Sequence, residues 1–312
     1  MAKPVTQITL GIDVAKDELV IADWENGQLI TLANQPSQIR AWLASLQGPA
    51  RLALEPTSHY HLIVADLAQG AGHTVYLVNP RQLNHYRQAV DIRHKSDPVD
   101  AQLLARYLAH EGAALRPYQP QSPAARELWA LLNRRATVVQ TRKQLQQSFR
   151  EIRLSIRALA SELNAVLERI DRRMTALIEQ LGWLDDYRRC RSIPGIGHLN
   201  AVALVTVFHR GAFSGLNAFV AFIGLDVRLR ESGHYKGKRK LTKRGPAELR
   251  RLLYCAAKPA RSHQGFARYH QAQLDKGLSK TAVNCVLARK LARIAFTLMS
   301  RQEMFREPGA AY

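Results

Sequence analysis

Short apolar runs open the chain and predict the strands of a sheet. Three of them predict a meander, at residues 7–13, 18–24 and 28–33. Asn26-Gly27, between the second and third runs, is a strong turn signal. Two later runs, each ending at or followed by a proline, predict further strands at residues 51–55 and 73–79.

Segments with helical periodicity alternate with the later strands. They predict helices at residues 36–46, at 58–69 and from Ser96 to about His110. Ser96 or Asp97 can cap the last of these, with Pro98 in its first turn. A meander followed by strand–helix alternation predicts a mixed sheet covered by helices, an α/β arrangement of the ribonuclease H type. We assign residues 1–116 to this domain.

A long segment without glycine or proline follows, from Ala124 to Leu181. Its apolar residues recur at mostly alternating spacings of three and four, which predicts a heptad-like stripe. An unbroken helix of this length needs a partner helix, and dimerisation is one use for it. A helical hairpin that folds back on its own chain is an equal alternative. We assign residues 117–182 to this long helical or coiled-coil segment.

The remaining residues, 183–312, predict a mostly helical domain. Helices are expected near residues 197–208, 216–223, 246–257 and 279–299. The glycine-rich turn at 192–197 resembles the hairpin of helix-hairpin-helix elements, whose backbone amides can hold phosphate. An ordinary turn between packed helices explains it equally well.

Charge narrows the class of partner. The chain has 45 Lys and Arg against 25 Asp and Glu, a formal net charge of +20. This excess self-repels unless a polyanion neutralises it, so nucleic acid is the expected partner, ahead of an anionic membrane. No stretch approaches the ~18 apolar residues of a membrane span, and the N-terminus lacks an apolar signal core. We expect a cytoplasmic, nucleoid-associated protein of a bacterium or archaeon, with its three cysteines as buried thiols.

Four acidic residues fall where the predicted sheet meets a helix. Asp13 lies at or near the end of the first strand, and Glu55 ends a later one. Asp97 and Asp100 are three apart, on one face of the predicted helix. Clustered carboxylates need a cation, and Mg²⁺ is the hard ion that oxygen ligands select. Each acid alone also has a simpler explanation as a turn residue, a solvated strand end or a helix cap.

These acids lie within a series of motifs that runs in order along nearly the whole chain. The motifs are Gly11-Ile-Asp13-Val-Ala-Lys16, Leu54-Glu55-Pro-Thr, Asn79-Pro80, Lys95-Ser-Asp97-Pro-Val-Asp100-Ala101, Ile193-Pro-Gly-Ile-Gly197 and Glu231-Ser232-Gly233. The series resembles the IS110 family of insertion-sequence transposases. One departure is local: relatives often have Glu-Ala-Thr-Gly where this chain has Glu55-Pro-Thr-Ser58, which leaves the start of the next helix open.

The resemblance implies a RuvC-like domain whose DEDD carboxylates, Asp13, Glu55, Asp97 and Asp100, hold Mg²⁺ or Mn²⁺. It also implies a C-terminal transposase domain with a nucleophilic serine, Ser232. Such an enzyme cuts and rejoins DNA through a covalent phosphoserine. An element-encoded bridge RNA guides it by pairing with donor and target DNA. A homo-oligomer, dimer or tetramer, is expected, with the site completed within one chain or between protomers.

The residues around Ser232 allow this role without requiring it. A serine hydroxyl needs a base or a metal to become a nucleophile, and His234 stands two positions away. A turn serine before a glycine is the simpler explanation of Ser232.

A basic run follows Ser232 and suits phosphate contact: Lys236, Lys238, Arg239, Lys240, Lys243 and Arg244. Point cations position a nucleic-acid backbone without reading bases, so pairing with a guide RNA would supply sequence choice. Two rival functions remain. One is a nuclease resembling Holliday-junction resolvases that uses the same carboxylates with water as nucleophile, and the other is a non-enzymatic nucleic-acid-binding protein.

Overall fold

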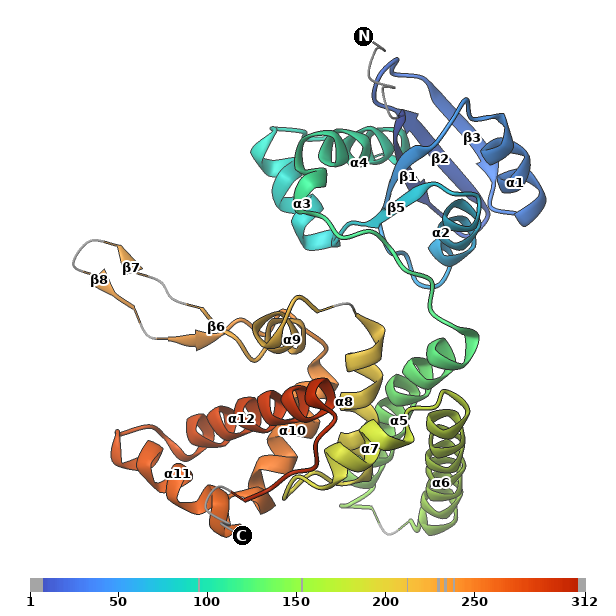
Figure 1. Cartoon of the computed structure of the whole chain (residues 1–312). Helices are drawn as coiled ribbons and strands as arrows, with labels where there is room; N and C mark the ends of the chain where they lie inside the picture. The colour runs from blue at the N-terminus through green and yellow to red at the C-terminus, as the bar shows by residue number, and fades with distance from the viewer. Residues whose placement is uncertain are drawn as a thin grey trace. The chain divides into compact units, whose positions relative to one another are not determined.

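The computed structural model describes residues 8–94, 96–152, 154–211, 213–228, 231–232, 235–237 and 239–307, without the side chains of residues 231, 235 and 236. The chain forms two compact units, Met1–Pro120 and Gln121–Tyr312 (Figure 1). Among the described helices, none is long and apolar enough to cross a membrane. The division into three functional domains stays a prediction, because compactness alone does not test it.

A five-stranded mixed sheet forms the centre of the first unit. Its strands are β1 (Ile8–Val14), β2 (Glu18–Asp23), β3 (Leu29–Ala33), β4 (Ala50–Leu54) and β5 (Thr74–Leu77), in the spatial order β3-β2-β1-β4-β5. The meander β1-β2-β3 is antiparallel, whereas β4 runs parallel to both β1 and β5. This topology confirms the predicted α/β fold of the ribonuclease H type.

Helices cover both faces of this sheet (Figure 1). They are α1 (Pro36–Ser45), α2 (His61–Gly70), α3 (Pro80–Ala89) and α4 (Asp97–Glu111), followed by the 3-10 turn η1 (Gly112–Ala114). Leu10, Ile12 and Val14 of β1 belong to the core under α1 and α2. The opposite face of the sheet lies against α4, which packs closely on β1 and β2.

Two elements of the first unit differ from the sequence prediction. The helix predicted from residue 58 begins at His61, because Ser58 adopts a left-handed backbone conformation with φ of 48° that no helix accommodates. Helix α3 was not predicted, because it is polar and buries a single residue, Leu83.

The long segment of the second unit is a hairpin and not one continuous helix. Helices α5 (Pro123–Ser148) and α6 (Arg157–Gln180) pack against each other. The ion pairs Arg135–Asp171, at 2.6 Å, and Arg173–Glu127, at 2.6 Å, join them. The apolar stripe continues through the connection, where Ile152 is 58% exposed, so periodicity alone did not reveal the break.

The other helices of the second unit share one core with this hairpin. They are α7 (Leu184–Arg191), α8 (His198–Arg210), α9 (Leu216–Ile223), α10 (Ala247–Ala260), α11 (Gln264–Asp275) and α12 (Lys280–Arg301). Two small antiparallel pairs complete it: β6 (Val227–Arg228) with β9 (Lys240–Leu241), and β7 (Glu231–Ser232) with β8 (Tyr235–Lys236). Helices α7 and α11 and both strand pairs were not predicted.

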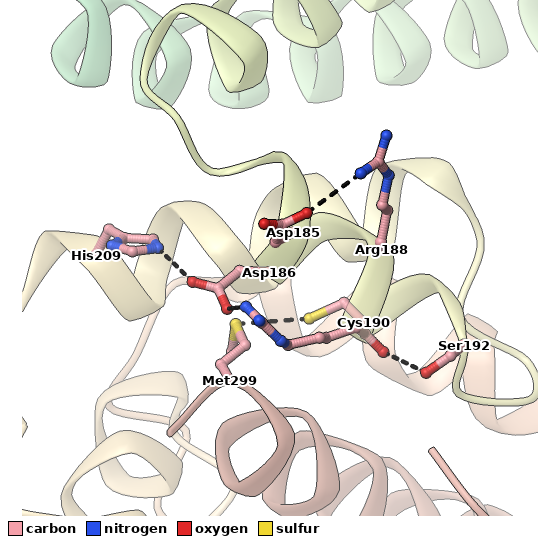
Figure 2. Close-up of polar contacts among 8 residues, drawn as sticks. Asp185, Asp186, Arg188, Cys190, Ser192, His209 and Met299 are labelled. Atoms are coloured by element: carbon pink, nitrogen blue, oxygen red, sulfur yellow. Dashed lines mark hydrogen bonds and ion pairs between the residues drawn. The ribbon is translucent and has the colours of Figure 1, made fainter. Parts of the chain in front are cut away.

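A polar network holds α7 against its neighbours (Figure 2). The Asp186 carboxylate accepts hydrogen bonds from Arg189, at 2.7 Å, and from Nε2 of His209 on α8, at 2.8 Å. Cys190 contacts Met299 of α12 at 3.6 Å between the sulfurs. Cys255, by contrast, is exposed, so the prediction of three buried thiols was wrong; it lies on the polar face of α10.

The glycine-rich turn after α7 is explained by packing. Gly195 has φ of +86°, and a methyl group there would lie 2.6 Å from the carbonyl oxygen of Ala256. The adjacent Ile193 and Ile196 are buried. This turn therefore lets α10 approach closely, as the packing alternative expected.

Candidate active site

The alternation of β1 decides where Asp13 points. Successive side chains of a strand face opposite sides of a sheet. Because Leu10, Ile12 and Val14 face α1 and α2, the residues between them, including Asp13, face the side covered by α4. The end of β1 thus presents the Asp13 carboxylate to α4, the helix that carries Asp97 and Asp100.

A very close helix–strand contact fixes this arrangement. A methyl group on Gly11 would lie 2.1 Å from the carbonyl oxygen of Ala101 and 2.2 Å from the amide nitrogen of Ala105. Only glycine lets α4 lie directly on β1 at this point. Glycine in the first motif, two residues before Asp13, is therefore a requirement of the packing that brings the first turn of α4 to the end of β1.

The charges of the four predicted acids act on one another. Burial is the largest cause that raises the pKa of Asp13, which reaches about 6. The negative charges of Asp97, Asp100 and Glu55 raise it further, while a hydrogen bond from the backbone of Val14 opposes them. The structure thus brings all four carboxylates into electrostatic range of one point. Repulsion of this kind is what a bound cation relieves.

The carboxylates are not arranged around a cation as they stand. Among the described residues, no three His, Cys, Asp or Glu side chains form a group that could hold a metal ion. Asp100 is instead paired with Arg87 of α3, whose Nη2 donates to its carboxylate at 2.5 Å. Both side chains are largely buried, 14% exposed for Arg87 and 10% for Asp100. The guanidinium supplies the positive charge that this acid requires.

Four carboxylates are the type of ligand that a divalent cation such as Mg²⁺ or Mn²⁺ prefers. Their joint role as ligands stays a prediction, since Asp100 would have to exchange Arg87 for the ion. Sequence reasoning missed Arg87 because it missed α3. A signal was present: the Asn79 side chain caps α3 by accepting from the amide of Arg81 at 2.9 Å, and Pro80 occupies the first turn.

Ser232 lies in a different setting. It ends β7, where it pairs with Tyr235 across a hairpin of two-residue strands. Its side chain is exposed. The Ser232 hydroxyl makes no hydrogen bond to any residue that the structure describes. The neighbouring Gly233 and His234 lie outside the described residues, so the position of the candidate base stays untested.

The basic run after Ser232 is only partly described. Lys238 and the side chain of Lys236 lie outside the described part, whereas Arg239, Lys240, Lys243 and Arg244 are exposed. The end of the run is anchored, because a methyl group on Gly245 would lie 2.0 Å from the carbonyl oxygen of Phe222. Arg250 also donates to the carbonyl oxygens of Gly245 and Ile223. The end of the basic run is therefore held against α9.

Two regions of the chain match models of known transposase families. Residues 10–156 match a transposase model, that of the DEDD transposases of IS110 elements. Residues 187–271 match the model described as transposase, IS116/IS110/IS902 family. The first match contains the four carboxylates, and the second contains Ser232 and the basic run.

Full-length relatives agree with these matches. The chain is 26% identical to the pilin gene-inverting protein of Moraxella lacunata, over 95% of this chain and 97% of the relative. It is also 26% identical to the transposase for insertion sequence element IS1111A of Coxiella burnetii, over 95% of this chain and 91% of the relative. The transposase for insertion sequence element IS1328 of Yersinia enterocolitica is 25% identical, over 95% of this chain and 98% of the relative.

Both halves of the chain thus match transposase models, and the relatives align along nearly its whole length. A divalent metal cofactor and DNA substrates are general properties of DEDD transposases. The chain therefore belongs to the IS110 family of insertion-sequence transposases and is an enzyme of DNA recombination.

Proposed function

We propose that this transposase is an RNA-guided recombinase that cuts and rejoins DNA through a covalent phosphoserine at Ser232. Asp13, Glu55, Asp97 and Asp100 would hold Mg²⁺ or Mn²⁺. The observation that carries the metal site is the packing of α4 on β1 at Gly11, which brings the first turn of α4, with Asp97 and Asp100, to the end of the strand that carries Asp13. The raised pKa of Asp13, to which the charges of these two acids and of Glu55 contribute, agrees with it. Acids that repel one another at the end of a strand are typical of a cation site.

The bound metal would supply positive charge to the phosphate and to the oxygens that enter and leave it. The Ser232 oxygen would attack the phosphorus, form the Ser–O–P bond and release its proton to solvent water, from which the departing DNA oxygen takes up a proton. The bond from phosphorus to one DNA oxygen breaks, and that oxygen leaves as a hydroxyl once it is protonated. A DNA hydroxyl from the other strand then reverses the step and frees Ser232, so the bond energy is conserved and rejoining needs no ATP.

Exposure of Ser232 supports this role, because a nucleophile that must meet a duplex backbone cannot be enclosed. The hairpin belongs to the second unit and the carboxylates to the first. The site would therefore be composite, completed within one chain or between protomers of a dimer or tetramer.

We further propose that a bridge RNA guides the enzyme by pairing with donor and target DNA, and the charge distribution supports binding of such a nucleic-acid strand. The net charge is +20, and the described cations of the basic run are single exposed side chains suited to phosphates. Contacts of this kind position a strand without choosing a sequence. Base pairing with an RNA would select the DNA sequence.

The test is a reaction of the purified protein, with its co-purifying RNA and Mg²⁺, on supercoiled DNA that carries element ends. Wild type should give a protein-linked DNA strand on a denaturing gel. Asp13→Asn and Ser232→Ala should both lose it. Cleavage without a linked strand, unchanged in Ser232→Ala, would instead establish a nuclease that uses water. Full activity in Asp13→Asn would refute the metal-site assignment.

A further inference from the structure

A large cavity lies within the second unit, between the β6–β9 pair and helices α11 and α12. Its volume is about 1090 Å³. Four of its cations lie on or next to the β6–β9 pair, and three more lie on α12: Arg228, Arg239, Lys240 and Lys243, then Arg289, Lys290 and Arg293. No acidic side chain lines it among the described residues. The α12 cations were not singled out by the sequence, because they are interspersed with the buried residues of a core helix.

Within the described part of the chain, these cations have no carboxylate partners. Arg293 donates to the neutral side-chain oxygen of Asn217 at 3.3 Å. Nε of Arg289 is buried and has no hydrogen-bond partner in the part of the chain that the structure describes. None of the seven cations forms an ion pair with a described residue. Like charges in one helical turn repel each other, and an anion in the cavity would relieve this repulsion.

The interior of the cavity combines these cations with apolar and aromatic surface. Leu241 of β9 and Val286 of α12 line it, together with the ring of Tyr269 from α11. The ammonium of Lys290 lies 3.7 Å from the centre of that ring. A duplex presents phosphates on its outside and offers nothing to a concave apolar wall. An unpaired strand offers both phosphates and exposed base faces.

We propose that this cavity binds two or three unpaired nucleotides of a single-stranded nucleic acid. The cations of α12 and those on or next to the β6–β9 pair hold the phosphates, and the wall formed by Tyr269, Leu241 and Val286 receives a base. The inference rests on the proposed function, in which DNA strands and guide RNA are unpaired during exchange. It assigns to α12 a second role besides packing the core.

Binding of short fluorescent strands to the full-length protein, freed of co-purified RNA, tests this directly. The probes are a twelve-nucleotide RNA, the DNA of the same sequence and the matching duplex. We expect both single strands to bind at least tenfold more tightly than the duplex at equal salt. The RNA and DNA arms distinguish a guide strand from an exchanged DNA strand as the natural occupant.

Two variants with matched loss of charge locate the site. Arg289→Gln with Lys290→Gln should weaken single-strand binding about tenfold and reduce the salt slope by about one to two. Arg261→Gln with Arg268→Gln removes two exposed charges outside the cavity and should change binding less than threefold. Tyr269→Leu should weaken binding without removing a charge, since it removes the aromatic part of the wall and the ring that Lys290 contacts. Melting temperature and circular dichroism establish that each variant is folded.

Equal loss in the two double variants, or equal affinity for single strands and duplex, would overturn the cavity proposal. A folded Arg289→Gln, Lys290→Gln variant that binds single strands normally would do the same. The assay contains no metal and no element ends. Loss of the cavity proposal can therefore be distinguished from loss of the proposed serine reaction, which is tested by formation of the protein-linked DNA strand.

Discussion

The carboxylate site and the serine hairpin are built in opposite ways. Asp13 and Asp100 lie on elements that pack so closely that a glycine is needed at position 11. Ser232 lies on a hairpin of two-residue strands, with its side chain exposed. Ligands of a metal must be held in a fixed geometry, and close packing does this. A nucleophile that reaches a DNA backbone needs access, which a thin hairpin gives.

This contrast means that changes in the two regions should affect different properties. Changes around the carboxylates should alter folding stability as well as chemistry. Changes at Ser232 should alter chemistry alone, because surface substitutions usually shift stability by no more than about 0.5 kcal/mol.

Gly11→Ala should have the largest effect on stability. The added methyl group meets the backbone of α4, which cannot move aside like a flexible side chain, so we expect a loss of about 3 kcal/mol or more. Urea denaturation measures it. Gly70→Ala is the control, because nothing lies within 4 Å of a methyl group there. A Gly11→Ala protein as stable as Gly70→Ala would show that the helix–strand contact is not essential.

Arg87→Met should cause the next largest loss of stability. It leaves Asp100 buried without its partner, which we expect to cost about 3 kcal/mol. Addition of Mg²⁺ or Mn²⁺ should restore part of this loss, because the ion takes the place of the guanidinium. Arg93→Met is the matched control, since the Arg93–Asp91 pair is 81% and 79% exposed and contributes little. If the metal stabilises Arg87→Met no more than wild type, Arg87 does not occupy a cation position.

The pH dependence of stability should be smaller and reports on Asp13. Its pKa in the folded protein, about 6, lies above its ordinary value, so the folded state binds the proton more tightly than the unfolded state. The contribution of Asp13 is therefore largest in acid and is lost as the pH rises from about 4 to 6. The change is at most about 3 kcal/mol, less because the site is partly solvated.

Comparison of Asp13→Asn with wild type in denaturation at several pH values isolates this contribution. The fall should be absent in the variant, and Mg²⁺ should reduce it in wild type. A fall of equal size in both proteins would assign it to other groups.

Ser58→Gly should have the smallest effect, and it should stabilise. Ser58 has φ of 48°, a conformation that glycine adopts without strain. We expect a gain of up to about 1 kcal/mol in the free energy of unfolding. A loss of stability would mean that the Ser58 hydroxyl, 3.2 Å from Nδ1 of His59, contributes more than the strain removes.

The first unit could be predicted well because its apolar positions have a clear period. The strands of the sheet alternate or are continuously apolar, and α4 begins after Ser96 with Pro98 in its first turn, although the Ser96 side chain makes no capping hydrogen bond. The elements that were missed lack this signal. Helix α3 buries one residue, and α11 buries only Phe266. Such helices are stabilised by neighbours distant in sequence, which a local pattern does not contain.

The acidic residues of the candidate site could be predicted from the sequence, but the arginine that pairs with one of them could not. Motif spacing identified Asp13 and Asp100, whereas the pairing of Asp100 with Arg87 depends on how α3 lies against α4. The cavity beside α12 likewise arises from four elements that meet only in the folded chain. The break after Ser148 was hidden because its apolar stripe continues and no glycine or proline marks the turn.

The most direct measurement is the identity of the residue that carries DNA. The linked strand formed with Mg²⁺ and element ends is trimmed by nuclease and protease, and the modified peptide is sequenced by mass spectrometry. We predict a nucleotide joined through phosphate to Ser232, and no linked peptide from a folded Ser232→Ala protein. A linkage at another residue, or DNA ends that are cut without any linkage, would contradict the proposed mechanism.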